Sequence, residues 1–135
     1  MNKSPHKKWL NHYESGVSPC LEYPSITLSD ALHQATEKFS NKTAFLFSGR
    51  HWSYRDLDDL VSRLANALLG LDLALGDRVG IYLPNCPQFI IGYYGILRSG
   101  GVAVPINPLL TGDDLSSIIE DSGMKIIITC SDLLP

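Results

Sequence analysis

The stretch RVGIYLPNCPQFIIGYYGILRSGGVAVPI, residues 78–106, decides the fold. Its two ends, 78–83 and 102–106, are short apolar runs without polar–apolar alternation, so each predicts a strand buried on both faces. The apolar run 89–97 between them predicts a buried helix that ends at Gly100-Gly101. Strand, helix and strand in this order are typical of a parallel unit joined by a right-handed crossover.

The pattern repeats toward the C-terminus. Thr111 and Asp114 are spaced as a capping pair and predict a helix that ends near Gly123. KIIITC, residues 125–130, predicts a third strand, which gives an α/β fold with a doubly wound parallel βαβαβ unit. Pro105 cannot donate a ladder hydrogen bond, so the second strand is expected to end there. A sheet that finishes on a bare strand before SDLLP is expected to be part of a larger N-terminal domain that has been truncated.

A helix, a hairpin and another helix are predicted on the N-terminal side. Thr27 and Asp30 form one capping pair, and Ser53 and Asp56 form a second, so helices begin at both places. Between them, two runs rich in aromatic residues flank the turn 48–50 and predict a β-hairpin. Residues 1–26 contain three prolines and predict an irregular arm, which leaves 27–135 as an incomplete subdomain.

Composition excludes several classes of protein. Hydrophobic residues make up 44% and charged residues 19% of the 135-residue chain, as in a globular protein. The net charge of −3 argues against a nucleic-acid partner, and the clustered Lys3, Lys7 and Lys8 are interpreted as a solvated terminus. The run 89–97 falls well short of the ~20 residues that span a bilayer. Three widely spaced cysteines indicate reduced thiols and a cytoplasmic protein.

Ligands of such sheets bind where the strands end, and three segments, 83–88, 105–111 and 130–135, occupy that edge. Asn85 and Thr111 are explained as helix caps, with Gln88 the third residue after Asn85. Cys86 has no histidine nearby in sequence to serve as a base, so it is interpreted as inert. Asn107, which precedes a proline, is a turn signal before it is a ligand contact.

The motifs of phosphate, metal and nucleophile chemistry are missing. No GxGxxG follows a strand, no GxxxxGK precedes Ser or Thr, and no GxSxG is present. The four histidines have no metal-ligand spacing. Gly92 and Gly95 share one helix face, where we expect them to allow close packing of the helix on the sheet. The sequence therefore assigns no catalytic, no cofactor-binding and no metal-binding residue.

The order of the pieces nevertheless resembles the N-terminal region of the adenylate-forming (AMP-binding) acyl-CoA synthetases. The resemblance covers about residues 27–135, and within the superfamily it is strongest to bacterial long-chain fatty-acid–CoA ligases. It rests on Trp52-Ser53-Tyr54, Leu64-Ala65-Asn66-Ala67-Leu68, Gly76-Asp77-Arg78-Val79, Leu83-Pro84-Asn85, the helix 93–101, Pro105-Ile106-Asn107-Pro108 and Glu120-Asp121-Ser122-Gly123.

The resemblance implies a two-step ligase reaction. A fatty-acid carboxylate attacks the α-phosphate of Mg·ATP to give an acyl-adenylate and pyrophosphate, and the thiol of CoA then displaces AMP. The family's phosphate loop, metal-binding acid, ribose-binding Asp and mobile Lys have no counterpart in residues 1–135. ATP, Mg²⁺, CoA and fatty acid are thus expected to bind a longer protein, and the chain alone is expected to be inactive.

Two alternatives stay open. One is another adenylate-forming ligase, acting on aryl or short-chain acids or on amino acids. The other is a stand-alone α/β binding module, which would need acidic residues at the strand ends where Asn85 and Asn107 stand. A homodimer formed through the N-terminal arm and peripheral association with a membrane are both left open by the resemblance.

Overall fold

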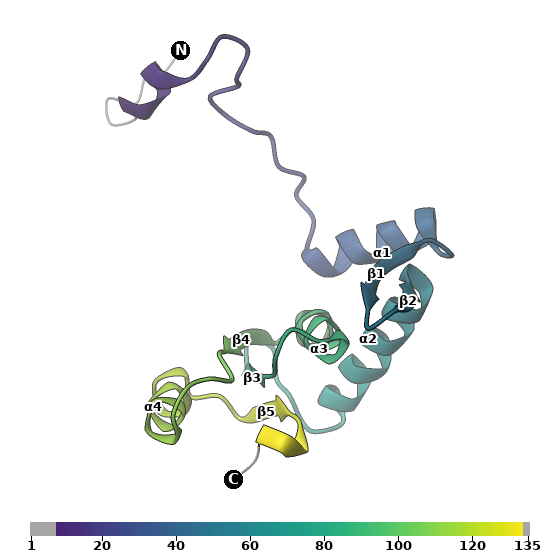
Figure 1. The fold of residues 1–135 in the computed structure, drawn as a ribbon, viewed down its shortest axis with the longest axis vertical. Coiled ribbons are helices and arrows are strands. Elements are labelled where there is room, and N and C mark those ends of the chain that lie inside the picture. The colour runs from purple at the N-terminus through teal and green to yellow at the C-terminus, as the bar shows by residue number, and fades with distance from the viewer. Residues whose placement is uncertain (1–7, 134–135) are drawn as a thin grey trace.

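The computed structural model describes residues 8–133 and confirms the predicted α/β architecture (Figure 1). The helices and strands follow in the order η1 (Lys8–His12), α1 (Leu28–Phe39), β1 (Thr43–Phe47), β2 (Arg50–Ser53), α2 (Tyr54–Leu69), β3 (Arg78–Tyr82), α3 (Pro87–Arg98), β4 (Val102–Ile106), α4 (Gly112–Ser122), β5 (Ile126–Thr129) and η2 (Ser131–Leu133), where η marks a 3-10 helix.

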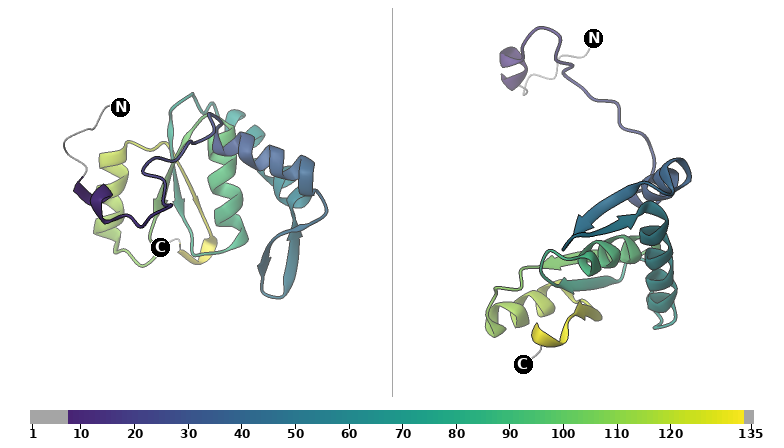
Figure 2. Two further views of the ribbon diagram at one scale, coloured as in Figure 1. Left: turned by 90° about the horizontal axis from the view of Figure 1, so that it is seen from above. Right: turned by 45° about the vertical axis from the view of Figure 1, so that its right-hand side comes forward.

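Strands β3, β4 and β5 form a parallel sheet in the order β4-β3-β5, so the first of them in sequence lies in the middle. Val79 of β3 is in register with Ala103 on one side and with Ile126 on the other. Helix α4 covers one face of the sheet, while α3 lies against the other (Figure 2). The doubly wound βαβαβ unit is therefore present as predicted.

Alternate residues of β3 point into two different cores. Val79 and Ile81 are fully buried with Ile96 of α3 on one face. Tyr82 faces the other side, where it joins Ile106 and Met124 in a core that also contacts side chains of α4. This two-sided burial explains why β3 shows no alternation of polar and apolar residues.

The hairpin and the first two helices are built on a third core of Leu32, Leu57 and Val61. Strands β1 and β2 pair in antiparallel fashion, and the turn between them is Ser48-Gly49. Both turn residues have positive φ, 47° and 76°, the combination that tight two-residue hairpin turns require. Arg50, predicted as part of the turn, is instead the first residue of β2.

Three of the four predicted helix caps are present. Thr27, Ser53 and Thr111 each accept a hydrogen bond from the backbone of the acid three residues on, and each acid accepts one in return. The hydroxyl of Thr27 donates to Asp30, and this bond holds the pKa of Asp30 below its ordinary value. Ser53 lowers the pKa of Asp56 in the same way.

These lowered pKa values predict a loss of stability in acid. A carboxylate whose pKa is lower in the folded chain stabilises it above the unfolded pKa of about 4, and this stabilisation is lost as pH falls through the folded value. The urea midpoint, followed by circular dichroism, should hold steady down to about pH 5 and then fall. Asp56→Asn should make that fall shallower, whereas Asp59→Asn, in an exposed pair with Arg63, should not. Equal slopes for both variants would contradict the assignment.

The cap predicted for α3 is wrong. The helix begins at Pro87 with Cys86 at the N-cap position, and no side chain caps it. Asn85 lies one residue further out. Proline at the first helical position explains this start, because its ring fixes a helical φ and its missing N–H would have had no partner within the helix.

Strand β4 runs through Pro105 instead of ending there. The N–H of Val102 donates to the carbonyl of Asp77, the residue just before β3, so the backbone nitrogens of even-numbered residues in β4 face β3. The nitrogen of Pro105 therefore points to the opposite side, where no described strand pairs with β4. A proline at an outward position of an edge strand costs no ladder hydrogen bond.

Gly92 and Gly95 differ in what they face. A Cβ on Gly92 would make ordinary contacts of 3.7–3.9 Å with Ile81 and Ile128 of the sheet, in line with the prediction. A Cβ on Gly95 would lie 2.8 Å from Leu64 Cδ2, so this glycine allows α3 to approach α2 and not the sheet.

Residues 8–27 contain η1 and otherwise no helix or strand, and they run away from the body of the molecule (Figure 1). Lys8 of the predicted basic cluster is exposed, whereas Lys3 and Lys7 lie outside the described residues. At the other end, β5 stops at Thr129, and among the described residues only the three-residue η2 follows it, in line with the prediction that no crossover helix follows this strand within residues 8–133.

Candidate functional site

The carboxyl ends of β3 and β5 border a hollow of about 280 Å³. Tyr82 and Thr129 are in register at the ends of these strands, and the segments that leave them form its walls. The hollow is lined by Leu83, Pro84, Cys86, Gln88, Ile128, Thr129 and Cys130. It lies at the carboxyl ends of parallel strands, the edge at which doubly wound sheets hold ligands.

A second hollow, of about 240 Å³, lies between the hairpin and the start of α3. Strand β1 contributes Phe45, Leu46 and Phe47, and the opposite wall comes from residues 85–90. Cys86 lines both hollows, so the turn into α3 separates them. Cys86 is thus the residue that the hollow beside the hairpin and the hollow at the sheet edge have in common.

The candidate site residues considered in the sequence analysis lie at this edge, but their roles in the structure differ. Asn85 lines the hollow beside the hairpin. Asn107 accepts a hydrogen bond from the N–H of Leu109 at 3.0 Å, which confirms it as a turn residue. Thr111 caps α4, as predicted. Cys86, Cys130 and the third cysteine, Cys20, are all free.

Sequence reasoning missed Thr129. Its hydroxyl oxygen is buried and has no hydrogen-bond partner among residues 8–133. A buried hydroxyl without a partner costs roughly 1–3 kcal/mol, so this atom marks a position where a polar partner would stabilise the fold. The run IIIT gave no such signal, because a threonine at the end of an apolar strand usually indicates β propensity alone.

The chemistry available at this edge is limited. The walls of both hollows are mostly aliphatic and aromatic, and their polar side-chain groups are two amides, two thiols and one hydroxyl. Among residues 8–133 there is no group of three or more His, Cys, Asp or Glu that could hold a metal ion.

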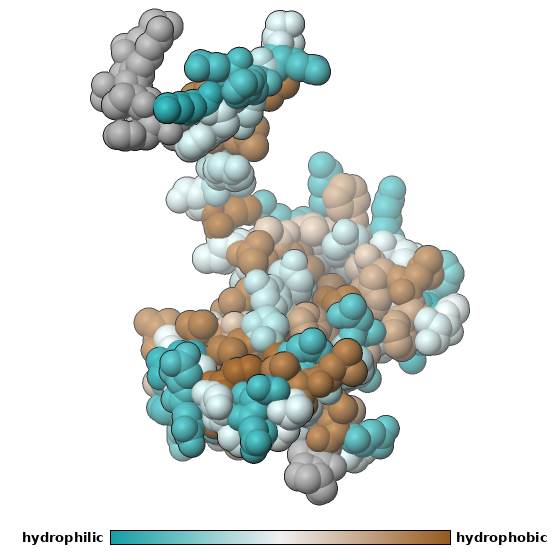
Figure 3. Space-filling view, turned by 60° about the vertical axis from the view of Figure 1, so that its left-hand side comes forward, coloured by the Kyte–Doolittle hydropathy of each residue, from teal (hydrophilic) through white to brown (hydrophobic). Residues whose placement is uncertain are grey.

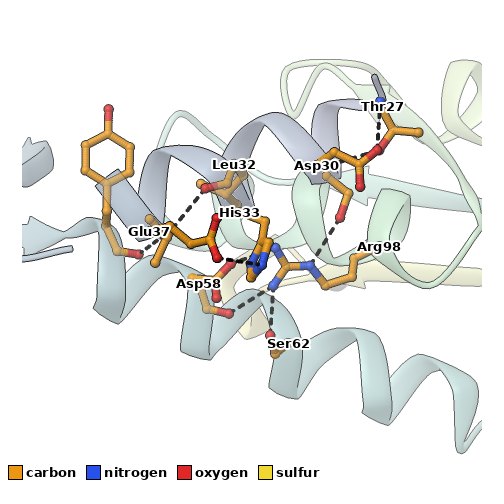
Figure 4. A network of polar contacts seen from close by, with 11 residues as sticks. Thr27, Asp30, Leu32, His33, Glu37, Asp58, Ser62 and Arg98 are labelled. Carbon is orange, nitrogen blue, oxygen red and sulfur yellow. Dashed lines mark hydrogen bonds and ion pairs between the residues drawn. The ribbon is translucent and has the colours of Figure 1, made fainter. Parts of the chain in front are cut away.

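A polar cluster that the sequence did not predict joins α1, α2 and α3 (Figure 4). The guanidinium of Arg98 makes an ion pair of 2.7 Å with Asp58, and it donates to Ser62 at 2.8 Å and to Ser29 at 3.2 Å. The Arg98 and Asp58 side chains are 19% and 22% exposed. Ser29 is 69 residues from Arg98 in sequence, so no local spacing could have indicated the contact. The geometry is that of a structural clamp.

Two further basic side chains, Arg78 and Lys125, make polar contacts near the amino ends of β3 and β5. Arg78 donates to the Ser122 carbonyl at 2.6 Å, and Lys125 pairs with Asp77 at 2.9 Å. The hydrogen bond from Lys125, followed by one from the N–H of Ala74, holds the pKa of Asp77 below its ordinary value. These contacts tie the start of β3 to the segment between α4 and β5.

The family model described as "AMP-binding enzyme" matches residues 32–134. The chain belongs to the AMP-binding enzyme family. It is 38% identical over 129 residues to a long-chain-fatty-acid–CoA ligase of Bacillus subtilis, a match that covers 96% of this chain and 23% of the relative. A crotonobetaine/carnitine–CoA ligase of Salmonella paratyphi A is 34% identical over 73% of this chain and 20% of its own length.

Solved structures of this family share the fold. A Mycobacterium tuberculosis fatty acyl CoA synthetase superposes with a TM-score of 0.70 and 33% identity, over 73% of this chain and 20% of that one. The anthranilate CoA ligase AuaEII superposes with a TM-score of 0.76 and 28% identity, over 79% and 21%. The family member described here thus spans about a fifth of the length of these relatives. None of the helices within residues 8–133 is long and apolar enough to cross a membrane.

Proposed function

We propose that this chain is the N-terminal portion of an ATP-dependent, AMP-forming long-chain fatty-acid–CoA ligase. The observation that carries the proposal is the 38% identity to the Bacillus subtilis ligase, which extends over 96% of the chain. That match includes most of the arm before Thr27, whereas the match to the Salmonella carnitine ligase covers 73% of the chain. Likeness in the arm therefore supports the fatty-acid assignment over the carnitine one.

The proposed role of residues 27–135 is to form part of the N-terminal subdomain that carries the active site of the whole enzyme. In support, the chain matches 26% of the N-terminal subdomain of Klebsiella oxytoca NpsA, with a TM-score of 0.71 and 25% identity. The hollows beside Cys86 and the unpartnered hydroxyl of Thr129 are the surfaces we expect the remainder to cover. ATP, Mg²⁺, CoA and the fatty acid would bind mainly outside the described residues, in the cytoplasm.

A graft tests the proposal. Residues 1–135 would replace the matching segment of the Bacillus subtilis fatty-acid ligase and, separately, that of the Salmonella carnitine ligase, and acyl-CoA formation would be measured with a panel of acids. We expect the Bacillus chimera to keep activity on long-chain fatty acids and the Salmonella chimera to lose most of its own. The reverse result would overturn the fatty-acid assignment, and two inactive but folded chimeras would overturn the scaffold role.

The chain alone provides a control for the graft. Because the family's phosphate loop, metal-binding acid and mobile Lys have no counterpart in residues 1–135, we expect the purified 135-residue chain to form no acyl-CoA and to release no pyrophosphate. Turnover by this chain would contradict the proposal. The second candidate, an aryl-acid ligase, is favoured by the higher TM-score of AuaEII, 0.76 against 0.70, and the aryl acids in the panel address it.

A further inference from the structure

Two cysteines that are far apart in the sequence lie at the same hollow. Cys86 and Cys130 both line the hollow of about 280 Å³ at the carboxyl ends of β3 and β5, and both are free. Both also pack, partly buried, against the core that contains Val79, Ile81 and Ile96. The structure thus gives Cys86, interpreted as inert from the sequence, a neighbouring thiol that no CxxC spacing indicates.

The alternation of side chains along β5 explains why the two thiols share one face of the sheet. Ile126 and Ile128 pack against the core beneath α3, whereas Ile127 packs in the core that contacts α4. Cys130 comes directly after the strand and continues this alternation, so its side chain lies on the α3 side. Cys86 is the N-cap residue of α3 and packs on the same core. Both thiols therefore lie where the first turn of α3 meets the end of β5.

The strand register limits the separation of the two cysteines. Tyr82 is in register with Thr129 at the ends of β3 and β5. The next residues, Leu83 and Cys130, leave the sheet side by side, where regular strands lie about 4.8 Å apart. Cys86 follows Leu83 after a bend in the chain, which keeps the two closer than the roughly 10 Å that three extended residues span. A disulfide joins Cα atoms roughly 4.4–6.8 Å apart, a separation within reach of this bend.

The chemistry of the hollow favours a bond between the thiols over a metal ion. Two sulfur atoms supply only half of a tetrahedral thiolate site, and the part of the chain that the structure describes holds no cluster of three or more His, Cys, Asp or Glu. Two neighbouring thiols are sufficient for a disulfide. In proteins whose cysteines are kept reduced, such bonds are usually transient and form in response to an oxidant.

We propose that Cys86 and Cys130 are a redox-sensitive pair that hydrogen peroxide oxidises to an intramolecular disulfide. One thiolate attacks a peroxide oxygen, the O–O bond breaks, and the sulfur becomes a sulfenic acid while hydroxide leaves. The second thiol then attacks that sulfur, the S–S bond forms, and the sulfenic oxygen leaves as water. Two thiols and one peroxide thus give one disulfide and two waters. The bond would tie the start of α3 to the end of β5 across the hollow, and a dithiol reductant would reverse it.

The third cysteine provides a control within the chain. Cys20 is exposed and belongs to residues 8–27, which stand clear of the body (Figure 3). A disulfide of Cys20 should therefore join two chains, and its yield should rise with protein concentration. The yield of the bond between Cys86 and Cys130 should be independent of concentration, because both thiols belong to one folded chain.

Peptide mapping by mass spectrometry after mild hydrogen peroxide treatment tests the pair. In the Cys20→Ala chain we expect both remaining thiols to disappear, the mass to fall by two hydrogens, and the peptides that hold Cys86 and Cys130 to stay joined until dithiothreitol is added. The urea midpoint of the oxidised chain should rise by roughly 1–2 M, because the bond closes a long loop. Sulfinic acids on unjoined cysteines, or disulfides between chains alone, would overturn the proposal.

A trivalent arsenical measures the proximity of the thiols in the reduced chain, since phenylarsine oxide binds two neighbouring thiols far more tightly than one. Cys86→Ala and Cys130→Ala should each weaken its binding on the order of 100-fold, whereas Cys20→Ala should leave it unchanged. Circular dichroism would confirm that the variants are folded. The unsubstituted chain, compared with glutathione as a single thiol, gives the same comparison without any variant. Binding no tighter than that of glutathione, or equal affinity in all three variants, would show that the thiols do not meet.

The proposed pair goes beyond the proposed function, and neither measurement depends on ligase activity. A chain that forms the disulfide would support the pair whatever the chimeras show. Active chimeras, in turn, would leave the ligase assignment intact if the two thiols stayed apart.

Discussion

Gly95→Ala is expected to lower the free energy of unfolding by about 2 kcal/mol, although alanine is the better helix former. The added Cβ would lie 2.8, 3.0 and 3.1 Å from Leu64 Cδ2, Cγ and Cβ. Leu64 cannot relieve all three contacts by changing rotamer, because its own Cβ is fixed to the backbone of α2. Helices α2 and α3 must therefore separate. Urea denaturation followed by circular dichroism measures the loss.

Gly92 provides the matched control, one turn earlier in the same helix. Its Cβ would stand 3.7–3.9 Å from Ile81 and Ile128, which is ordinary contact. Gly92→Ala should accordingly stabilise the chain by roughly 0.5–1 kcal/mol. The double variant Gly95→Ala with Leu64→Ala should be more stable than the two single losses predict together. If both glycine variants gained stability, the close approach of the helices would be refuted.

Arg98→Ala is expected to cost about 2 kcal/mol. The change removes four hydrogen bonds and leaves Asp58 without its counter-ion at 22% exposure. Breaking a fully buried ion pair costs roughly 3–5 kcal/mol, and the remaining solvent access of both side chains lowers the figure here. Because Arg98 binds residues of both α1 and α2, α1 should also become more open to hydrogen exchange.

Arg63→Ala is the control for this second experiment. Arg63 pairs with Asp59 at 3.7 Å, and these side chains are 73% and 65% exposed, so the expected cost is below about 0.5 kcal/mol. Arg98→Ala combined with Asp58→Ala should recover part of the loss, since no unpaired carboxylate remains. A cost for Arg98→Ala as small as that for Arg63→Ala would show that the clamp contributes nothing.

Elements defined by local chemistry could be predicted from the sequence. The capping pairs that begin at Thr27, Ser53 and Thr111 each span only four residues, and each predicts the start of a helix. The structure has all three helix starts. The order of apolar strands and helices from residue 78 likewise indicates the doubly wound sheet. Asn85 failed as a cap because Pro87 competes for the same turn, and nothing in the spacing decides between them.

Features that depend on distant neighbours could not be predicted. Whether Pro105 interrupts a strand depends on which edge its nitrogen faces, and that is fixed by pairing with β3. The partners of Arg98 and the contact between Gly95 and Leu64 depend on how three helices meet. The hollow at the sheet edge joins residues 83–88 with 128–130, so its lining follows from the strand order and not from any motif.

Pro105 in β4 also determines at which edge of the sheet a further strand can pair. An added strand would meet a missing donor at Pro105 on the β4 side, which discourages pairing there. On the other side, β5 pairs with β3 alone among the described strands, and its sequence IIIT has high β propensity and no charge. Self-assembly of this chain into fibrils or inclusion bodies should therefore begin at β5, and a lysine in place of Ile127 should act as a gatekeeper against it.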